Sequence, residues 1–350
     1  MTEAAQNPSP PPDDACADAD DDRIGSTAYS KHYVLSNLVK LIDSETTSTH
    51  ESSVAELPED LDQTLCQLWD MSSDQEVVAF LIEVQDLVKI FLQIVKATNK
   101  PRLTEILMGI LASVLSSEAG FSKFKDDSDL AQLTVSLLSC RDPPTLIETV
   151  RLLNVILTRA SWSDTWENTF TALDAWDDLD FILTSTTNEK LLEQCSQFLD
   201  SGLECSSYIK TALLSQPPQS LVCMASALQQ ACHASSETTC AFLLHAFHSL
   251  TTDDLSLRAL LTISELPELL TRYLRIFKDS SFNDQYHLNA LLAVVSIVHC
   301  SPQPLATQNL ISELESLESS LVDADACPDL KDTMNDLFQR TPAVEERWQE

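Results

Sequence analysis

Apolar stretches that recur every 43 to 48 residues place the strongest constraint on how this chain folds. Four of them look like the same helix, and each carries a glutamate near its start. These glutamates are Glu105, Glu148, Glu193 and Glu237, at separations of 43, 45 and 44 residues. A step of 43 residues back reaches Asp62, and a step of 48 forward reaches Gln285, each in a stretch of the same kind. A repeat of about 40–47 residues is typical of armadillo and HEAT proteins.

The segments between these stretches favour helices as well. Shorter helical patterns over 86–97, 129–139, 217–232 and 265–277 supply further helices for each unit. Only 4 of the 350 residues are glycine, whereas sheet proteins need glycine for tight turns. Since one repeat cannot bury its apolar face alone, neighbouring repeats must stack. We therefore expect an all-α, armadillo/HEAT-like α-solenoid of about six helical repeats, with a compact all-α bundle as the alternative.

Changes in composition near both ends predict four segments. Residues 1–22 are rich in proline and then in aspartate, which is typical of a disordered acidic leader. Residues 23–57 are expected to hold an N-terminal capping helix and an acidic linker, residues 58–322 the solenoid, and residues 323–350 a C-terminal helix and tail. The first residues lack the basic start and apolar core of a signal peptide, so a secreted protein is not expected.

Several helix starts are visible in the sequence. Pro58, Pro101 and Pro143 stand just before apolar stretches, where a proline fits the first helical turn at little cost. The string SDQE over 73–76 predicts a capping box, with Ser73 as the cap and Glu76 reaching back to it. An acidic-directed kinase site is the alternative interpretation of that string.

No common catalytic or nucleotide-binding motif is present, because the sequence lacks Gly-x-Ser-x-Gly, Walker A, dinucleotide, HExxH and C-x-x-C patterns. Cys240, His245 and His248 share one predicted helix, but no second Cys/His pair stands close by to complete a metal site. The ten cysteines are expected to be reduced thiols. We expect no enzyme activity, no cofactor and no small-molecule substrate.

The formal net charge of −33 limits the classes of partner. An acidic surface repels nucleic acid and anionic membranes, and the longest apolar runs are too short to span a bilayer. The basic stripe formed by Arg272, Arg275 and Lys278 is expected to serve as an internal counter-charge. The partners are therefore expected to be proteins, and basic ones if charge selects any. A solvated acidic surface without a dedicated partner is the alternative.

One asparagine has the sequence setting in which armadillo proteins bind peptides. The last helix of an armadillo repeat lines the concave groove and often offers an asparagine in a Leu-x-Asn setting to the backbone of an extended peptide. Asn154 has this setting, whereas Ser113 and Asp200 stand roughly in its place in two other repeats. A full ladder of amides is therefore absent from the sequence, and a solvent-facing polar residue is the alternative interpretation of Asn154.

Five strings in a fixed order resemble the serum amyloid A-like protein family. They are NPSPPP (7–12), IGSTAYSKHYVLSNLVKLI (24–42), LWDMSSDQEVVAFL (68–81), PRLTEILMGIL (101–111) and DPPTLIETVRLL (142–153). The resemblance extends over about residues 7–160. It implies an armadillo-like fold with no known enzymatic activity, a role in promoting cell proliferation that is described mainly for synovial fibroblasts, and a nuclear location, with the cytoplasm as a further location.

Candidate partner-binding residues lie in two of these strings. Tyr29, Lys31 and His32 stand at the start of a predicted helix that either caps the solenoid or docks on a partner. Trp69 stands in the next string, and Asn154 completes the set. We interpret the chain as a non-enzymatic protein-protein interaction scaffold linked to proliferation. An acidic chaperone that shields basic client proteins is the alternative.

Overall fold

The computed structural model describes residues 22–47, 56–159, 162–215, 219–252, 254–277, 285–300, 307–321 and 336. Apart from Asp22, the predicted leader over 1–22 lies outside the described residues. The predicted C-terminal helix and tail over 323–350 likewise lies outside them, apart from Asp336. Within the described ranges the chain is helical, and its sole β-type pairing is an isolated bridge between Arg23 and Ser30.

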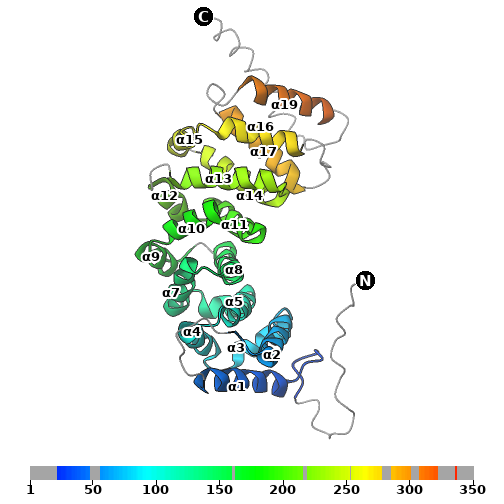
Figure 1. Ribbon diagram of the computed structural model, residues 1–350, viewed down its shortest axis with the longest axis vertical. Coiled ribbons are helices and arrows are strands. Elements are labelled where there is room, and N and C mark those ends of the chain that lie inside the picture. The colour runs from blue at the N-terminus through cyan, green and yellow to red at the C-terminus, as the bar shows by residue number, and fades with distance from the viewer. Residues whose placement is uncertain are drawn as a thin grey trace, which may run out of the picture.

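Long helices stack one on the next and form one wall of the molecule, here called the inner wall. They are α2 (Glu59–Met71), α5 (Pro101–Ser116), α8 (Pro143–Arg159), α11 (Glu189–Cys205), α14 (Glu237–Ser249) and α17 (Gln285–Cys300). Each helix contacts the next one in this series, and Figure 1 shows α2, α5, α8, α11 and α14 following one another along the long axis. They contain the six stretches that the sequence spacing singles out. The prediction of an all-α, armadillo-like solenoid is confirmed.

A second column of helices, here called the outer wall, packs alongside the long ones and lies to their left at the levels of α4, α7 and α10 in Figure 1. It consists of α4 (Leu87–Ala97), α7 (Ser128–Ser136), α10 (Ala175–Ser185), α13 (Gln219–Ala234) and α16 (Leu266–Phe277), with α19 (Gln308–Leu321) packed on α16. Short helices lead from each long helix to the next outer-wall helix. These are α3 (Gln75–Glu83), α6 (Glu118–Phe124), α9 (Asp164–Ala172), α12 (Ser207–Ser215) and α15 (Asp254–Leu260). A repeat therefore has three helices: one short, one in the outer wall and one in the inner wall. The N-terminal helix α1 (Lys31–Thr47) and two 3-10 turns, η1 (Leu137–Ser139) and η2 (Leu250–Thr252), complete the elements of the described ranges.

Two helices begin at the prolines that the sequence indicates, whereas one predicted helix cap differs from the structure. Pro101 occupies the first turn of α5, and α8 begins at Pro143, where the missing N–H of proline costs nothing. The predicted capping box over 73–76 is wrong. Asp74 caps α3, because its side chain accepts the backbone N–H of Glu76 at 2.8 Å. The carboxylate of Glu76 bonds elsewhere, as described below.

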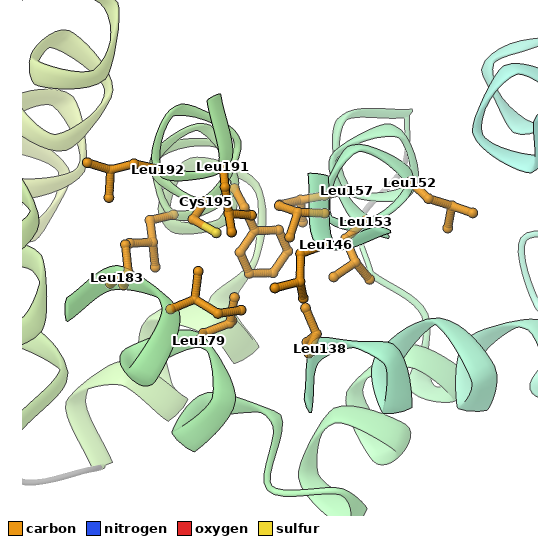
Figure 2. Close-up of a cluster of buried hydrophobic side chains, with 14 of the residues drawn as sticks. Leu138, Leu146, Leu152, Leu153, Leu157, Leu179, Leu183, Leu191, Leu192 and Cys195 are labelled. Carbon is orange, nitrogen blue, oxygen red and sulfur yellow. The ribbon is translucent and has the colours of Figure 1, made fainter. Parts of the chain in front are cut away.

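The apolar core runs between the two walls along the whole stack. Figure 2 shows part of it, in which Leu146, Leu153 and Leu157 of α8 face leucines of α10 and the 3-10 turn η1. All of these side chains are at most 5% exposed. Full burial of one such leucine stabilises the fold by roughly 1.5–3 kcal/mol. This continuous core holds the repeats together.

Hydrogen bonds between neighbouring repeats join residues that stand a nearly constant number of positions apart in sequence. The Thr145 hydroxyl donates to the Pro101 carbonyl across 44 residues, and the Trp166 indole N–H donates to the Lys125 carbonyl across 41. The Ser220 hydroxyl donates to Asp180 across 40 residues. Each separation is about one repeat, so equivalent levels of neighbouring repeats are joined.

The basic stripe of the sequence lies on α16. The Arg275 guanidinium pairs with Glu313 of α19 at 2.8 Å, and Arg272 lies 2.7 Å from the imidazole of His233 on α13. Arg275 therefore acts as an internal counter-charge, as the sequence predicts. Lys278 lies outside the described residues.

Candidate functional site

Residues 22–30, here called the N-terminal clasp, bind the start of α3 through Glu76. The backbone N–H of Ser26 donates to Oε2 of Glu76 at 2.7 Å, and the Ser26 hydroxyl donates to the same oxygen at 3.0 Å. Gly25 has φ +54°, and a Cβ at that position would lie 2.5 Å from the Glu76 carboxylate. Only glycine fits both the backbone angle and the close approach. With Ile24 buried beneath, each residue of the string Ile-Gly-Ser has a structural role.

Asp22, the last residue of the acidic run, caps the helix that follows. Its carboxylate accepts the backbone N–H of His32 at 2.8 Å and the hydroxyl of Ser30. The hydrogen bond from Ser30, and after it the one from His32, lowers the pKa of Asp22 below its ordinary value. This cap begins α1 (Lys31–Thr47).

The helix α1 closes the N-terminal end of the solenoid with one face and leaves the other exposed. Val34, Leu38 and Leu41 are buried, and the Tyr33 hydroxyl bonds to Gln67 of α2. On the opposite face Leu35 and Val39 are 41% and 54% exposed. Of the candidate residues at the helix start, Lys31 is half-buried, whereas His32 is exposed and Tyr29 is 38% exposed. This end of the solenoid thus carries both a capping face and an open face.

Trp69 belongs to a contact that joins three long helices, here called the Gly109 contact. The indole of Trp69 on α2 packs against Gly109 of α5, so closely that a Cβ on Gly109 would lie 2.3 Å from the indole ring. The carbonyl of Gly109 in turn accepts a hydrogen bond from the Arg151 guanidinium of α8 at 2.7 Å. Trp69 is half-buried, and its indole packs within the protein against Gly109.

Asn154 is buried between α8 and α11 and is 5% exposed. Its side-chain NH₂ donates to the backbone carbonyl of Gln194 at 3.1 Å and lies 3.3 Å from the Gln194 side-chain oxygen. The amide therefore joins two neighbouring long helices, and it does not project to solvent. Its buried carbonyl oxygen has no hydrogen-bond partner among the described residues.

The repeated glutamates of the inner wall form ion pairs in the N-terminal part of the stack. Glu105 pairs with Arg102 at 2.8 Å, and Glu148 pairs with Arg151 at 2.6 Å. Burial raises the pKa of Glu148, which the nearby Arg151 guanidinium partly offsets. Arg102 also bonds Asp62 of α2 at 2.8 Å. Charge on this part of the wall is thus largely balanced within the protein.

From α11 onward the inner wall is poor in basic residues. Only two lysines and no arginine occur between Arg159 and Arg258. One of them, Lys190, pairs with Glu193 at 2.7 Å, and the ammonium of the other, Lys210, bonds the hydroxyl of Thr252 at 3.0 Å. The carboxylates that follow along α11 and α14 have no arginine or lysine beside them in sequence. We call three of them the acidic zone: Asp200, Glu204 and Glu237.

A histidine lies beside two members of the acidic zone, Asp200 and Glu204. His245 on α14 lies 3.8 Å from Asp200 on α11. This carboxylate, more than any other group, raises the pKa of His245, against the lowering effect of burial. The pKa of His248, one turn further along α14, is lowered because that imidazole is buried and lies near His245. The acidic zone therefore stabilises positive charge at its surface.

Within the described ranges, no three His, Cys, Asp or Glu side chains gather in an arrangement that could hold a metal ion. The Cys195 thiol is buried, and burial raises its pKa to about 12. Two open depressions of about 470 Å³ each lie beside the start of α5. One of them is lined by Asp62, Arg102 and Glu105. Of the helices in the described part of the chain, none alone meets the length and apolarity that a bilayer crossing requires, and the one pair that does so together, α5 and α6, is bent by 105°.

Comparison with known proteins identifies relatives for about half of the chain. The zebrafish protein saal1 (Danio rerio) is 38% identical over 203 residues, which cover 57% of this chain and 43% of that protein. The human protein SAAL1 (Homo sapiens) is 36% identical over 186 residues, which cover 51% of this chain and 39% of that protein. The match thus spans less than half the length of these curated relatives. No protein-family model matches the chain.

Solved structures with a similar arrangement of helices include designed armadillo repeat proteins. A designed armadillo repeat protein in complex with the peptide (KR)4 superimposes with a TM-score of 0.52, at 14% identity, over 74% of this chain and 98% of the designed one. Computationally designed armadillo repeat proteins for modular peptide recognition superimpose with the same TM-score over 73% of this chain and 98% of theirs. The chain therefore has an armadillo-like fold, and over about half of its length it is similar to proteins named SAAL1.

Proposed function

We propose that this chain is a non-enzymatic scaffold whose inner wall binds extended, basic segments of partner proteins. The observation that carries the proposal is the acidic zone, where Asp200, Glu204 and Glu237 lie on neighbouring long helices without arginine or lysine beside them in sequence. An extended peptide laid along the stack meets one helix after another, so that successive basic side chains reach successive carboxylates. The similar designed solenoid in complex with (KR)4 supports this mode of binding.

The acidic zone is favoured over the N-terminal part of the wall because no arginine or lysine stands beside its carboxylates in sequence. Around α5 and α8 the carboxylates Glu105 and Glu148 already bind arginines of their own helices. A basic peptide would have to displace those guanidinium groups. In the acidic zone it would add positive charge where the protein already raises the pKa of His245.

Binding of fluorescein-labelled (KR)4, followed by anisotropy, tests the proposal. We expect the double variant E204Q/E237Q to bind more weakly by about fivefold, since each exposed ion pair contributes about 0.5 kcal/mol. The matched control is D60N/D126N, which removes the same charge from exposed positions outside the acidic zone. Equal loss in both variants would mean that only net charge matters and would contradict the placement of the site.

An acidic chaperone that shields basic client proteins is the second candidate, favoured by the net charge of −33. Salt separates the two, because screening weakens a complex held by charge alone far more than one with apolar contacts. Tagged protein purified from proliferating cells with parallel washes at low and high salt gives the comparison. A small set of partners that survives high salt supports the scaffold. A broad set of basic proteins that is lost at high salt supports the chaperone.

We further propose a role in promoting cell proliferation and a nuclear location, both of which rest on the family resemblance alone. Depletion of the protein from cultured fibroblasts, followed by re-expression, tests the first. Wild-type protein should restore the division rate, whereas E204Q/E237Q should not if partner binding at the acidic zone underlies the role. Immunofluorescence of the endogenous protein tests the location, and exclusion from nuclei would contradict it.

A further inference from the structure

The outward face of α10 carries an exposed aromatic side chain on a helix that is otherwise well packed. Its inward residues, among them Leu179 and Leu183, are 1% exposed and belong to the core (Figure 2). Phe181 lies between them in sequence and on the opposite side of the helix, because residues two apart on a helix point in different directions. It is 70% exposed, the highest value of any large aromatic residue in the described ranges.

Further exposed apolar residues belong to the turn before α10 and to the helix packed beside it. Leu173, in the turn that leads into α10, is 39% exposed, and Val222 on the adjoining helix α13 is 49% exposed. The two helices pack side by side, as the bond from Ser220 to Asp180 shows. Single exposed apolar residues are ordinary, but a group on neighbouring elements typically marks an interaction site. Phenylalanine in such a position can bury a large area against a partner.

Four aspartates stand close to Phe181 in sequence, without a lysine or arginine among them. The string DAWDDLD places Asp174, Asp177, Asp178 and Asp180 on and just before α10. Between Arg159 and Lys190 the sequence contains no lysine or arginine, and α13 contains none either. Burial chiefly, and Asp177 to a smaller extent, raise the pKa values of Asp178 and Asp180, while the hydrogen bond from Ser220 offsets part of the rise for Asp180. Like charges that oppose each other in this way are stabilised by a cation supplied from outside.

We propose that Leu173, Phe181, Val222 and the aspartates of α10, together called the outer patch, form a docking surface for an arginine-bearing amphipathic segment of a partner protein. Apolar residues of that segment would cover Phe181, and its arginines would pair with Asp174 and Asp177. Arginine suits the patch better than lysine, because a guanidinium stacks on an aromatic face while it binds a carboxylate. A second copy of this chain is not the occupant we propose, since the net charge of −33 opposes its approach.

This surface is separate from the proposed peptide site. The outer patch lies on α10 and α13 of the outer wall, whereas the acidic zone lies on α11 and α14 of the inner wall (Figure 1). The two sites also differ in chemistry, because the outer patch offers an exposed aromatic ring and the acidic zone offers carboxylates and an imidazole. Loss of one site should leave the other intact.

Binding of two labelled peptides, (RLLR)3 and (KLLK)3, to the full chain tests the proposal. We expect (RLLR)3 to bind at least fivefold more tightly than (KLLK)3. The variant F181S should weaken (RLLR)3 binding at least fivefold, and D177N should weaken it about threefold. The matched control is L255S on α15, where the leucine is 71% exposed and follows Asp253 and Asp254 in sequence but has no aromatic residue beside it. Because both side chains are exposed, both variants should keep the helical circular dichroism spectrum of the wild type.

Three results would overturn the inference. The first is (RLLR)3 affinity in F181S within twofold of wild type. The second is an equal loss in F181S and L255S, which would indicate non-specific apolar binding. The third is loss of (RLLR)3 binding in E204Q/E237Q with no loss in F181S. That result would place (RLLR)3 on the inner wall together with (KR)4. Retained (KR)4 binding in F181S, together with lost (RLLR)3 binding, supports two separate sites.

Discussion

The Gly109 contact makes an unusual stability prediction. In the interior of an ordinary helix, glycine to alanine stabilises by about 0.8–1 kcal/mol. At Gly109 the added Cβ would lie 2.3 Å from the Trp69 indole, and overpacking of this kind costs about 1–3 kcal/mol. The cost exceeds the gain at most values in these ranges. We therefore expect G109A to destabilise the protein by about 1 kcal/mol, with Trp69 forced away from α5.

A double-mutant cycle with W69L isolates the cause. In the W69L background the space above Gly109 is open, so G109A should stabilise by up to about 1 kcal/mol, as in an ordinary helix. Urea denaturation followed by circular dichroism measures all four proteins, and the coupling between the two positions should be about 1–3 kcal/mol. If G109A stabilises the wild type as much as it stabilises W69L, then the indole does not restrict this position and the explanation is wrong.

Further predictions concern the clasp, the acidic zone and the thiols. E76A should lose the two bonds to Ser26 and speed hydrogen exchange of residues 22–34, and unchanged exchange would contradict the role of the clasp. His245, whose pKa is raised by Asp200, contributes stability that is present below its ordinary pKa of 6.5 and is lost as pH rises through the raised value. The stability of wild type relative to H245Q should thus fall with rising pH, and a rise would refute the assignment. Among the described thiols, exposed Cys205 should react with iodoacetamide before Cys195, whose pKa is about 12. Equal rates in peptide mapping would be inconsistent with the burial of Cys195.

The fold was largely predictable because the long helices repeat their apolar pattern at a nearly constant spacing. That spacing places Glu105, Glu148 and Glu193 at equivalent levels of the inner wall, where the structure has them. Of the short helices, the start of α3 was indicated by the string SDQE over 73–76, and the others were not predicted. Helices such as α6 and α15 have seven residues each, too few for a helical period to stand out, and tertiary packing determines them.

The candidate site was less predictable, because its residues depend on contacts between repeats. Asn154 matches a peptide-binding setting by sequence, yet its NH₂ group bonds Gln194 forty residues away. Glu76 matches a local capping box, yet its carboxylate bonds Ser26 across 50 residues. Phe181 carries no motif, and its exposure follows only from the side of α10 that faces the core. Local sequence shows which residues are polar but not which distant partner each one meets.

Because bonded residues of neighbouring repeats stand a nearly constant number of positions apart, a chain of this kind can change in length during evolution by whole repeats. The bonds from Thr145, Trp166 and Ser220 each span 40 to 44 residues, so every repeat depends on its immediate neighbours and on nothing more distant. Duplication or removal of one whole repeat would therefore give each remaining bond an equivalent partner. An insertion of half that length would leave both walls mismatched at the junction. Selection can thus alter how many partner residues the molecule spans in steps of one repeat, without redesigning its core.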